Sequence, residues 1–194
     1  MRKEFIHKIF SNIPTLKTER LSLRAMHPMD AEDMFDYARR EDVTKYLLWS
    51  PHNSVSYTKD YLRYIQTRYT LGDFYDWAII DREDSRRMIG TCGFTKIDTV
   101  NNSAEIGYVL NPDFHHNGYA YEAAKRVLEF GFYELGLQRI EARFMKGNEA
   151  SLKVMEHLGM TFEGYHKDAV FVKGKYRTVG YCAITKDEFC GIEE

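Results

Sequence analysis

The sequence has few cysteines and no long run of apolar residues. Only three cysteines occur among 194 residues, Cys92, Cys182 and Cys190, and no two of them form a CxxC pair. An odd number of cysteines predicts free thiols in a reducing compartment; we expect Cys92 and Cys182 in the core and Cys190 in an irregular tail. No stretch approaches the roughly 20 apolar residues that cross a bilayer. We therefore expect a cytoplasmic protein that neither enters nor crosses a membrane.

The chain also lacks an excess of charge of either sign. Its 27 lysines and arginines face 29 aspartates and glutamates, which gives a formal net charge of -2. This balance offers no general electrostatic basis for binding nucleic acid. Histidine and cysteine do not cluster at metal-ligand spacing, and the adjacent His115 and His116 point apart on most backbones. We expect no direct nucleic-acid partner and no metal site.

Prolines are scarce as well, and neither a repeat nor a low-complexity linker interrupts the chain. With only four prolines, residues 1–194 are expected to form one domain with a core over about 16–187. Apolar periodicity alternates between the strand and helix periods, which predicts a mixed α/β (α+β) layer fold. The predicted strands are 21–26, 74–80, 87–96, 103–110, 139–145, 161–172 and 176–184, with a hairpin turn at 173–174. The predicted helices are 30–40, 57–69, 118–135 and 149–158.

One segment has the pattern of an anion-binding site. The strand that ends at Leu110 leads through a turn to Gly118, Ala120 and a long amphipathic helix. A helix N-terminus presents unpaired N–H groups and the positive end of the helix dipole, and a glycine there allows close approach. The alternative is that Gly118 and Ala120 only allow a turn to start a helix. Asn148 poses a similar choice, because it can cap the next helix or donate to a ligand.

These segments also carry a family resemblance. Tyr108 to Leu110, His115-x-x-Gly118-x-Ala120 and Asn148-x-x-Ser151 occur in the order and spacing of the Gcn5-related N-acetyltransferases (GNAT). Within that family the chain looks most like the RimJ/RimL-type ribosomal-protein alanine acetyltransferases. The resemblance extends from about Leu16 to Lys186.

The resemblance implies acetyl-CoA as cofactor and a mostly antiparallel sheet splayed between its fourth and fifth strands, here the strand ending at Leu110 and the strand 139–145. The pantetheine arm would lie in that splay. The implied cofactor contacts are the main chains of Tyr108, Val109 and Leu110, the diphosphate-binding amides of His115, His116, Asn117, Gly118, Tyr119 and Ala120, and the side chain of Asn148. The family usually has Gln or Arg where His115 stands.

Two residues are candidates for proton transfer. Direct acyl transfer needs no covalent intermediate when both substrates are held in contact. Glu105 matches the position where related acetyltransferases often place a general base; the alternative is a solvent-facing strand residue. Many relatives place a tyrosine acid on the helix after the asparagine, but Met155 stands there and cannot donate. This leaves Ser151 as the candidate acid, unless it only caps the helix.

The acceptor is the least determined part of the sequence-based interpretation. An α-amine with a pKa near 8 is roughly a fifth neutral at pH 7.4, whereas a lysine amine is only about 0.1% neutral, so a weak base suits the α-amine. We therefore predict acetylation of a protein N-terminus, specifically of a ribosomal protein. The alternatives are a small amine, such as a polyamine, amino acid or aminoglycoside, and a non-catalytic acyl-CoA-binding module. Tyr61, Tyr64, Tyr69 and Phe74 could line the acceptor groove or belong to the core. The sequence leaves a homodimer open.

Overall fold

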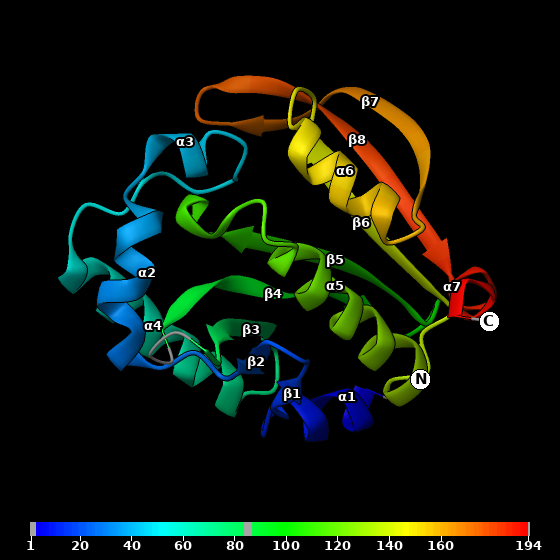
Figure 1. Ribbon diagram of the computed structural model, residues 1–194, viewed down its shortest axis with the longest axis horizontal. Coiled ribbons are helices and arrows are strands. Elements are labelled where there is room, and N and C mark those ends of the chain that lie inside the picture. The colour runs from blue at the N-terminus through cyan, green and yellow to red at the C-terminus, as the bar shows by residue number, and fades with distance from the viewer. Residues whose placement is uncertain (1–2, 84–86, 194) are drawn as a thin grey trace.

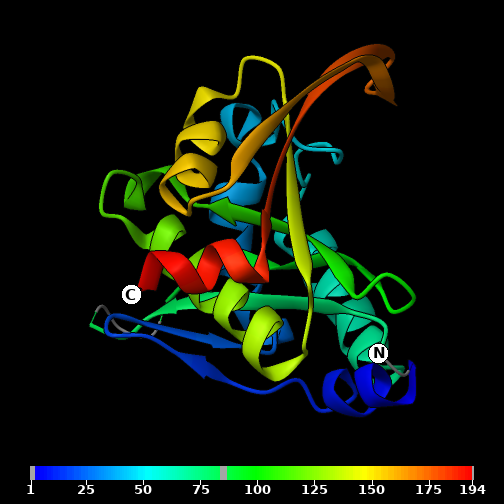
Figure 2. The ribbon, with the colours of Figure 1, turned by 90° about the vertical axis from the view of Figure 1, so that its right-hand side faces the viewer.

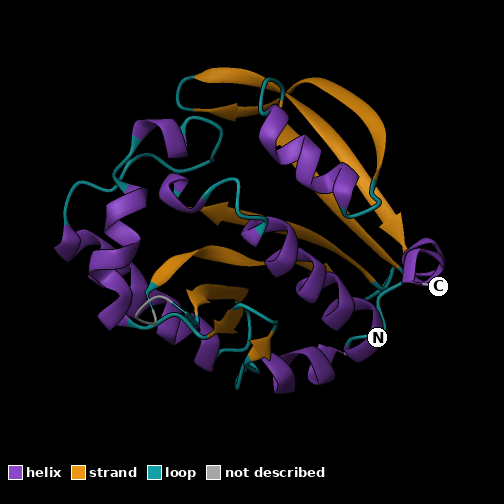
Figure 3. Ribbon diagram, viewed as in Figure 1, coloured by secondary structure: helices purple, strands orange, loops and turns teal. Residues whose placement is uncertain are grey.

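The computed structural model describes residues 3–83 and 87–193 and is built around one twisted sheet (Figures 1 and 3). The sheet order is β1-β2-β3-β4-β5-β6-β8-β7. The strands are β1 (Leu16–Lys17), β2 (Leu21–Arg24), β3 (Tyr75–Asp81), β4 (Met88–Asp98), β5 (Ser103–Leu110), β6 (Arg139–Met145), β7 (Thr161–Val172) and β8 (Lys175–Thr185). The helices are α1 (Lys3–Phe10), η1 (Pro28–Asp30), α2 (Ala31–Ala38), α3 (Glu41–Thr44), α4 (Val55–Thr70), η2 (Pro112–Phe114), α5 (Tyr119–Glu129), η3 (Phe130–Glu134), α6 (Glu149–His157) and α7 (Lys186–Glu193). Residues 1–2 and 194 of the predicted domain lie outside the described residues.

Helices cover both faces of the sheet, as strand alternation requires. Trp77 and Ile79 of β3 belong to the core cluster that includes α1 and α5, whereas Ala78 and Ile80 belong to the cluster of α2 and α4. Successive side chains of a strand point to opposite faces, so one strand contributes to both cores. Figure 2 shows the strong twist between β1 and β2 at one end of the sheet and the long β7–β8 hairpin at the other.

The sheet opens between β5 and β6. These two strands pair in parallel only from Ser103–Arg139 to Ile106–Ala142, whereas β5 continues along β4 and β6 continues along β8. Over the described residues, the second half of β5 has no partner on its β6 side. The predicted mixed, mostly antiparallel sheet with a splay is therefore confirmed. The two strands are the fifth and sixth, not the fourth and fifth, because the short β1 precedes them.

Most predicted elements are present, and the differences concern features that sequence periodicity does not indicate. Helices α1, α3 and α7 and strand β1 were not predicted, and α7 places Cys190 in a helix instead of an irregular tail. The predicted helix 118–135 is α-helical only to Glu129 and continues as a π-helix, in which Leu135 N–H donates to Phe130 O. Cys92 and Cys182 are buried in the core as expected. Among the described helices, none combines the length and apolar character needed to cross a bilayer.

Candidate functional site

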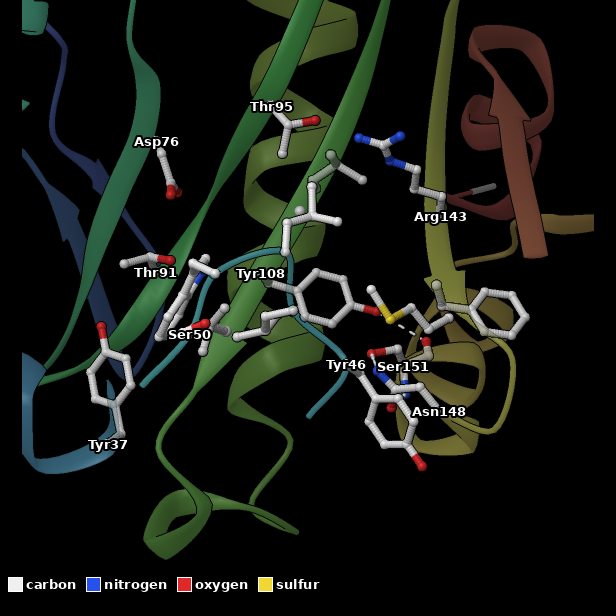
Figure 4. Close-up of a pocket in the computed structure, with 18 of the residues that line it drawn as sticks. Tyr37, Tyr46, Ser50, Asp76, Thr91, Thr95, Tyr108, Arg143, Asn148 and Ser151 are labelled. Carbon is white, nitrogen blue, oxygen red and sulfur yellow. Dashed lines mark hydrogen bonds between the residues drawn. The ribbon is translucent and has the colours of Figure 1, made fainter. Parts of the chain in front are cut away.

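A cavity of about 720 Å³ lies on the α2–α4 side of the sheet and reaches the gap beside β5 (Figure 4). Its floor follows from strand register, which aligns Asp76, Gly93 and Gly107 in one row across β3, β4 and β5. Two glycines in that row leave the sheet surface without side chains. The cavity floor therefore depends on the register in which β3, β4 and β5 pair.

The cavity has two chemically different ends. We call one the Asp76 end; it is lined by Tyr37, Trp49, His52, Tyr57, Tyr61, Asp76 and Thr91. We call the other the Asn148 end; it is lined by Glu105, Tyr108, Arg143, Asn148, Ser151 and Met155. Figure 4 shows Asp76, Thr91 and Tyr37 on one side, Arg143, Asn148 and Ser151 on the other, and the Tyr108 ring between them.

Polar contacts at the Asn148 end join β5 to α6 across the splay. The Tyr108 hydroxyl donates to the Ser151 carbonyl oxygen at 3.0 Å, and burial raises the pKa of this phenol. Asn148 caps α6, since its Oδ1 accepts from Ser151 N–H at 3.3 Å while its Nδ2 donates to Ser151 Oγ at 2.9 Å. Met155 lies one turn after Ser151 and also lines the cavity. The capping alternative for Asn148 is thus observed, and a second Nδ2 hydrogen remains for another acceptor.

The main chain of β5 faces the splay at alternate residues. Asn111 N–H donates to Ile89 O in β4, and main-chain groups two residues apart point the same way, so those of Val109 also face β4. The main-chain groups of Tyr108 and Leu110 then face the gap. This corrects the main-chain cofactor contact expected for Val109, which instead lines the cavity through its side chain. The Leu110 carbonyl oxygen already has a neighbour, His115 Nε2 at 3.2 Å.

The turn before α5 holds a set of main-chain donors. Among the described residues, none accepts a hydrogen bond from the amides of His116, Asn117, Gly118, Tyr119 or Ala120. Gly118 has φ +78°, and a Cβ built there would meet only Arg20 Nη2, at 3.5 Å. The expectation that the His115 amide binds the diphosphate is also corrected, because this N–H already donates to Pro112 O at 3.0 Å. Five amides, not six, can therefore bind an anion here.

Arg20 fixes this turn, although the sequence had indicated no role for it. Its Nη1 donates to Asn117 O at 2.9 Å, its Nε donates to Glu122 Oε2 at 2.7 Å, and its guanidinium lies 4.5 Å from the centre of the Tyr119 ring. Glu122 also accepts from the Thr18 hydroxyl at 2.5 Å. These contacts tie the start of α5 to the β1–β2 turn, about 100 residues earlier in the chain.

Glu105 lies at the Asn148 end with its carboxylate held in place. Its Oε1 is 3.0 Å from Arg143 Nε and accepts from the Thr95 hydroxyl at 2.6 Å. Its side chain is only 11% exposed, so the alternative of a solvent-facing strand residue does not describe it.

The Asp76 end contains residues that the sequence did not single out. Burial raises the pKa of Asp76 to about 7, although hydrogen bonds from Trp77 N–H and Thr91 act to lower it. Burial lowers the pKa of His52. The His52 ring packs within 5.0 to 5.8 Å of Trp49, Tyr57 and Tyr61. Of the four aromatics considered for the acceptor groove, Tyr61 lines this cavity, and Tyr69 is buried in the core with Phe74 packed against it.

Comparison with known proteins gives a consistent result. A family model for the acetyltransferase (GNAT) domain matches residues 20–161. The uncharacterised N-acetyltransferase p20 of Bacillus licheniformis is 37% identical over 177 residues, which cover 91% of this chain and 99% of p20. Two characterised relatives differ in their acceptors. The spermidine N(1)-acetyltransferase of Escherichia coli is 29% identical over 55% of this chain and 61% of its own, and the [ribosomal protein uS5]-alanine N-acetyltransferase of Escherichia coli is 25% identical over 92% and 95%.

Solved structures share the same fold. The acetyltransferase (GNAT family) from Bacillus anthracis superposes with a TM-score of 0.79 at 30% identity, covering 90% of this chain and 99% of that chain. The ribosomal L7/L12 α-N-protein acetyltransferase RimL, solved in complex with coenzyme A, has a TM-score of 0.76 at 21% identity and covers 90% and 99%. Both therefore share the overall fold of this chain.

Proposed function

The chain belongs to the GNAT acetyltransferase family, and on that premise we propose that it transfers the acetyl group of acetyl-CoA to the N-terminal α-amine of a protein. The observation that carries this proposal is that one continuous cavity joins the β5–β6 gap to the Asp76 end. The gap can admit a thioester from one side, and the Asp76 end can admit an amine from the other. Binding both in contact supplies most of the required rate enhancement.

The residues around the gap fit acetyl-CoA. The five unpaired amides around the start of α5 suit a diphosphate, and the gap-facing main chains of Tyr108 and Leu110 suit the amide-containing pantetheine arm. The remaining hydrogen on Asn148 Nδ2 can be donated to the same arm. When bound, acetyl-CoA supplies the activated acyl group. RimL, which shares the fold, was solved with coenzyme A, and this supports the assignment.

Two side chains are proposed for the proton transfers. Glu105, held by Arg143 and Thr95, is placed to accept a proton from the reacting nitrogen, directly or through water. Ser151 Oγ accepts from Asn148 and keeps its own hydrogen, which it can give to the departing sulfur. No nucleophilic cysteine is needed, and burial raises the pKa of both Cys92 and Cys182.

The subgroup and the acceptor are also proposals. The full-length similarity to the uS5-alanine acetyltransferase supports a RimJ/RimL-like, ribosomal-protein-directed enzyme working in the cytoplasm. A small polyamine is the second candidate, because the Asp76 end is lined by aromatic rings and a carboxylate and one relative acetylates spermidine.

Thiol release from acetyl-CoA tests the function. Purified protein and acetyl-CoA are mixed with one candidate acceptor at a time. The acceptors are Ala- or Ser-initiated peptides, spermidine, amino acids and an aminoglycoside. Release with the peptides alone supports the α-amine acceptor, and release with spermidine alone supports the polyamine. Binding of acetyl-CoA by calorimetry without thiol release from any of these amines would instead identify a non-catalytic acyl-CoA-binding module.

A further inference from the structure

We propose that Asp76 binds the acceptor as its ammonium ion and takes the first proton from it, with the Tyr37 hydroxyl and the surrounding aromatic rings holding the nitrogen in place. This inference rests on the proposed function and names a catalytic residue for it. It also defines the acceptor class as a primary ammonium group.

The position of Asp76 is set by the sheet. Its Oδ1 accepts from Trp77 N–H at 3.0 Å, and the Thr91 hydroxyl donates to the same carboxylate. Its partner across the ladder is Gly93, where an added Cβ would lie only 2.8 Å from Oδ1. The glycine therefore gives the carboxylate its place on the cavity floor. Two fixed donors orient the group and leave its remaining lone pairs for a ligand.

Tyr37 provides an independent indication of a ligand at the same end. Its side chain is fully buried, at 0% exposure, and its ring lines the cavity. Within the described residues its hydroxyl is the buried side-chain polar atom left without a hydrogen-bond partner. Folding a hydroxyl into such a position is costly unless something bonds to it. A nitrogen held at Asp76 would supply that partner.

Among the described residues, the groups that face Asp76 bring no cation to it. The titratable groups that face it are Tyr37 from α2, Tyr61 and Tyr69 from α4, and Cys92 from β4, and all of them are neutral near pH 7. His52, from the loop before α4, is also neutral because burial lowers its pKa. Glu105, by contrast, is paired with Arg143.

This environment suits both binding and proton transfer. Because burial raises the pKa of Asp76 to about 7, roughly half of the protein carries a basic carboxylate there at neutral pH. Aromatic faces attract a desolvated ammonium, and Trp49, Tyr57 and Tyr61 line this end. A base whose pKa is close to the working pH is also the most effective one for proton transfer.

The proton balance assigns separate tasks to the two carboxylates. In the first step, an N–H bond of the ammonium breaks and an O–H bond forms on Asp76. The electron pair left on nitrogen forms the C–N bond as the thioester C–S bond breaks. Nitrogen then loses its second proton to Glu105, and the sulfur gains a proton from Ser151. The proton on Glu105 passes to Ser151 and restores its hydroxyl. Asp76 returns its proton to solvent, which accounts for the one proton released overall.

The test is the pH dependence of kcat/KM for Asp76→Asn and Thr91→Val, with acetyl-CoA and either an Ala-initiated peptide or spermidine as the acceptor. In the wild type we expect kcat/KM to rise up to about pH 7 and to fall again above the pKa of the amine, because the site takes the acceptor as its ammonium ion. Asp76→Asn should lower kcat/KM about 10- to 100-fold at pH 7, and the rise should continue towards the pKa of the amine itself, near 8 for the peptide and near 10 for spermidine. Thr91→Val removes a hydrogen bond that favours the carboxylate, so its acid limb should move above pH 7.

Two controls keep the result specific. Asp73→Asn changes an exposed carboxylate three residues away and should retain the wild-type profile. Glu105→Gln should lower the rate and leave the acid limb at about pH 7. Thermal unfolding and acetyl-CoA calorimetry show which variants remain folded, and Thr91→Val keeps the test valid if Asp76→Asn does not fold. A wild type that releases no thiol with any amine overturns the proposed function and this inference with it. An active wild type with unchanged acid limbs in both Asp76→Asn and Thr91→Val overturns the inference alone.

Discussion

In the proposed mechanism, the Ser151 hydroxyl gives its proton to the departing sulfur. Ser151→Ala removes that proton but keeps the main-chain N–H that Asn148 caps, so α6 should remain folded. We expect the single-turnover rate to fall about 10- to 100-fold while the acetyl-CoA dissociation constant stays within a factor of about three. Ser151→Thr retains a hydroxyl and should recover most of the rate. An unchanged single-turnover rate in Ser151→Ala would restrict Ser151 to capping.

Asp76 should also lower the stability of the folded protein, in a pH-dependent way. Its pKa is about 7 in the folded chain and 3.8 as an ordinary exposed carboxyl, so the folded state binds the proton more tightly. Ionising Asp76 therefore costs folding free energy, and this cost grows from about pH 4 to pH 7 and is constant above it.

Asp76→Asn cannot ionise and should avoid that cost. At pH 8 we expect it to be more stable than the wild type by about 1–3 kcal/mol, with the difference disappearing near pH 4. Denaturant unfolding at the two pH values measures this. A difference that is the same at pH 4 and pH 8 would contradict the raised pKa.

Individual residues differ in how far the sequence revealed them. Gly118, Asn148 and Ser151 stand next to a helix start, and the contacts that define them lie within a few positions. Asp76 and Tyr37 lie in segments whose local pattern indicates only a strand and a helix, and only the folded chain brings both to one end of the same cavity. Arg20 belongs with them, since its partners Asn117 and Glu122 lie about 100 residues away.

The turn that starts α5 depends on one residue without a side chain. Gly118 has φ +78°, a backbone conformation that β-branched residues rarely adopt. In the proposed complex its amide contacts the diphosphate. Gly118→Val should therefore raise the acetyl-CoA dissociation constant at least tenfold by calorimetry. Gly136→Val is the matched control because Gly136 has φ +73° and no neighbour within 4 Å of an added Cβ. It should lose stability but keep the wild-type dissociation constant, and equal affinity losses in both variants would remove Gly118 from the binding site.

The β7–β8 hairpin is held over the cavity by a contact at its tip. Lys173 Nζ donates to the Thr44 carbonyl oxygen of α3 at 2.6 Å, and Val170 and Val179 of the hairpin line the cavity. Figure 1 shows the tip extending towards α3. This hydrogen bond joins the β7–β8 hairpin to α3, and the segment between α3 and α4 contributes Trp49 and His52 to the Asp76 end.

Lys173→Met removes that hydrogen bond. We expect the KM for the acceptor to rise several-fold with little change in acetyl-CoA affinity, because the acceptor end loses its support. Amide hydrogen exchange over residues 41–53 should become faster. Lys175→Met, on the same hairpin and exposed, is the control and should change neither quantity. If Lys173→Met behaves like that control, the tip does not shape the acceptor end.

Local pattern found the long elements more reliably than the short ones. Strands β5 and β6 were predicted with their observed bounds because alternation and turn residues mark both ends. The hairpin turn at Lys173 and Gly174 was also predicted, and both residues have positive φ. The two-residue β1 and the four-residue α3 are too short to show a period, and packing on their neighbours decides them.

The two parts of the sheet should respond together to the cofactor. β5 and β6 share only four ladder pairs, but Ile106, Ile140 and Cys182 lie in one core cluster. Acetyl-CoA at 100 times its dissociation constant should stabilise the folded chain by about 2.7 kcal/mol, which is about 5–11 °C in Tm for a chain of this length. Calorimetric melting should show one transition that moves upward. No shift in the wild type would contradict acetyl-CoA binding, and a full shift in Gly118→Val at the same acetyl-CoA concentration would place the binding site elsewhere.

The sequence by itself determined the α/β class, the order of the long elements and the turn that precedes α5, because periodicity, caps and glycine positions act over a few neighbouring residues. It could not determine the cavity. The row of Asp76, Gly93 and Gly107 exists only when three strands pair in one register, and the Tyr37 hydroxyl is buried without a partner only once α2 packs against β4. Burial then changes the acidity of a carboxylate whose local sequence is ordinary, and burial is a property of the whole folded chain.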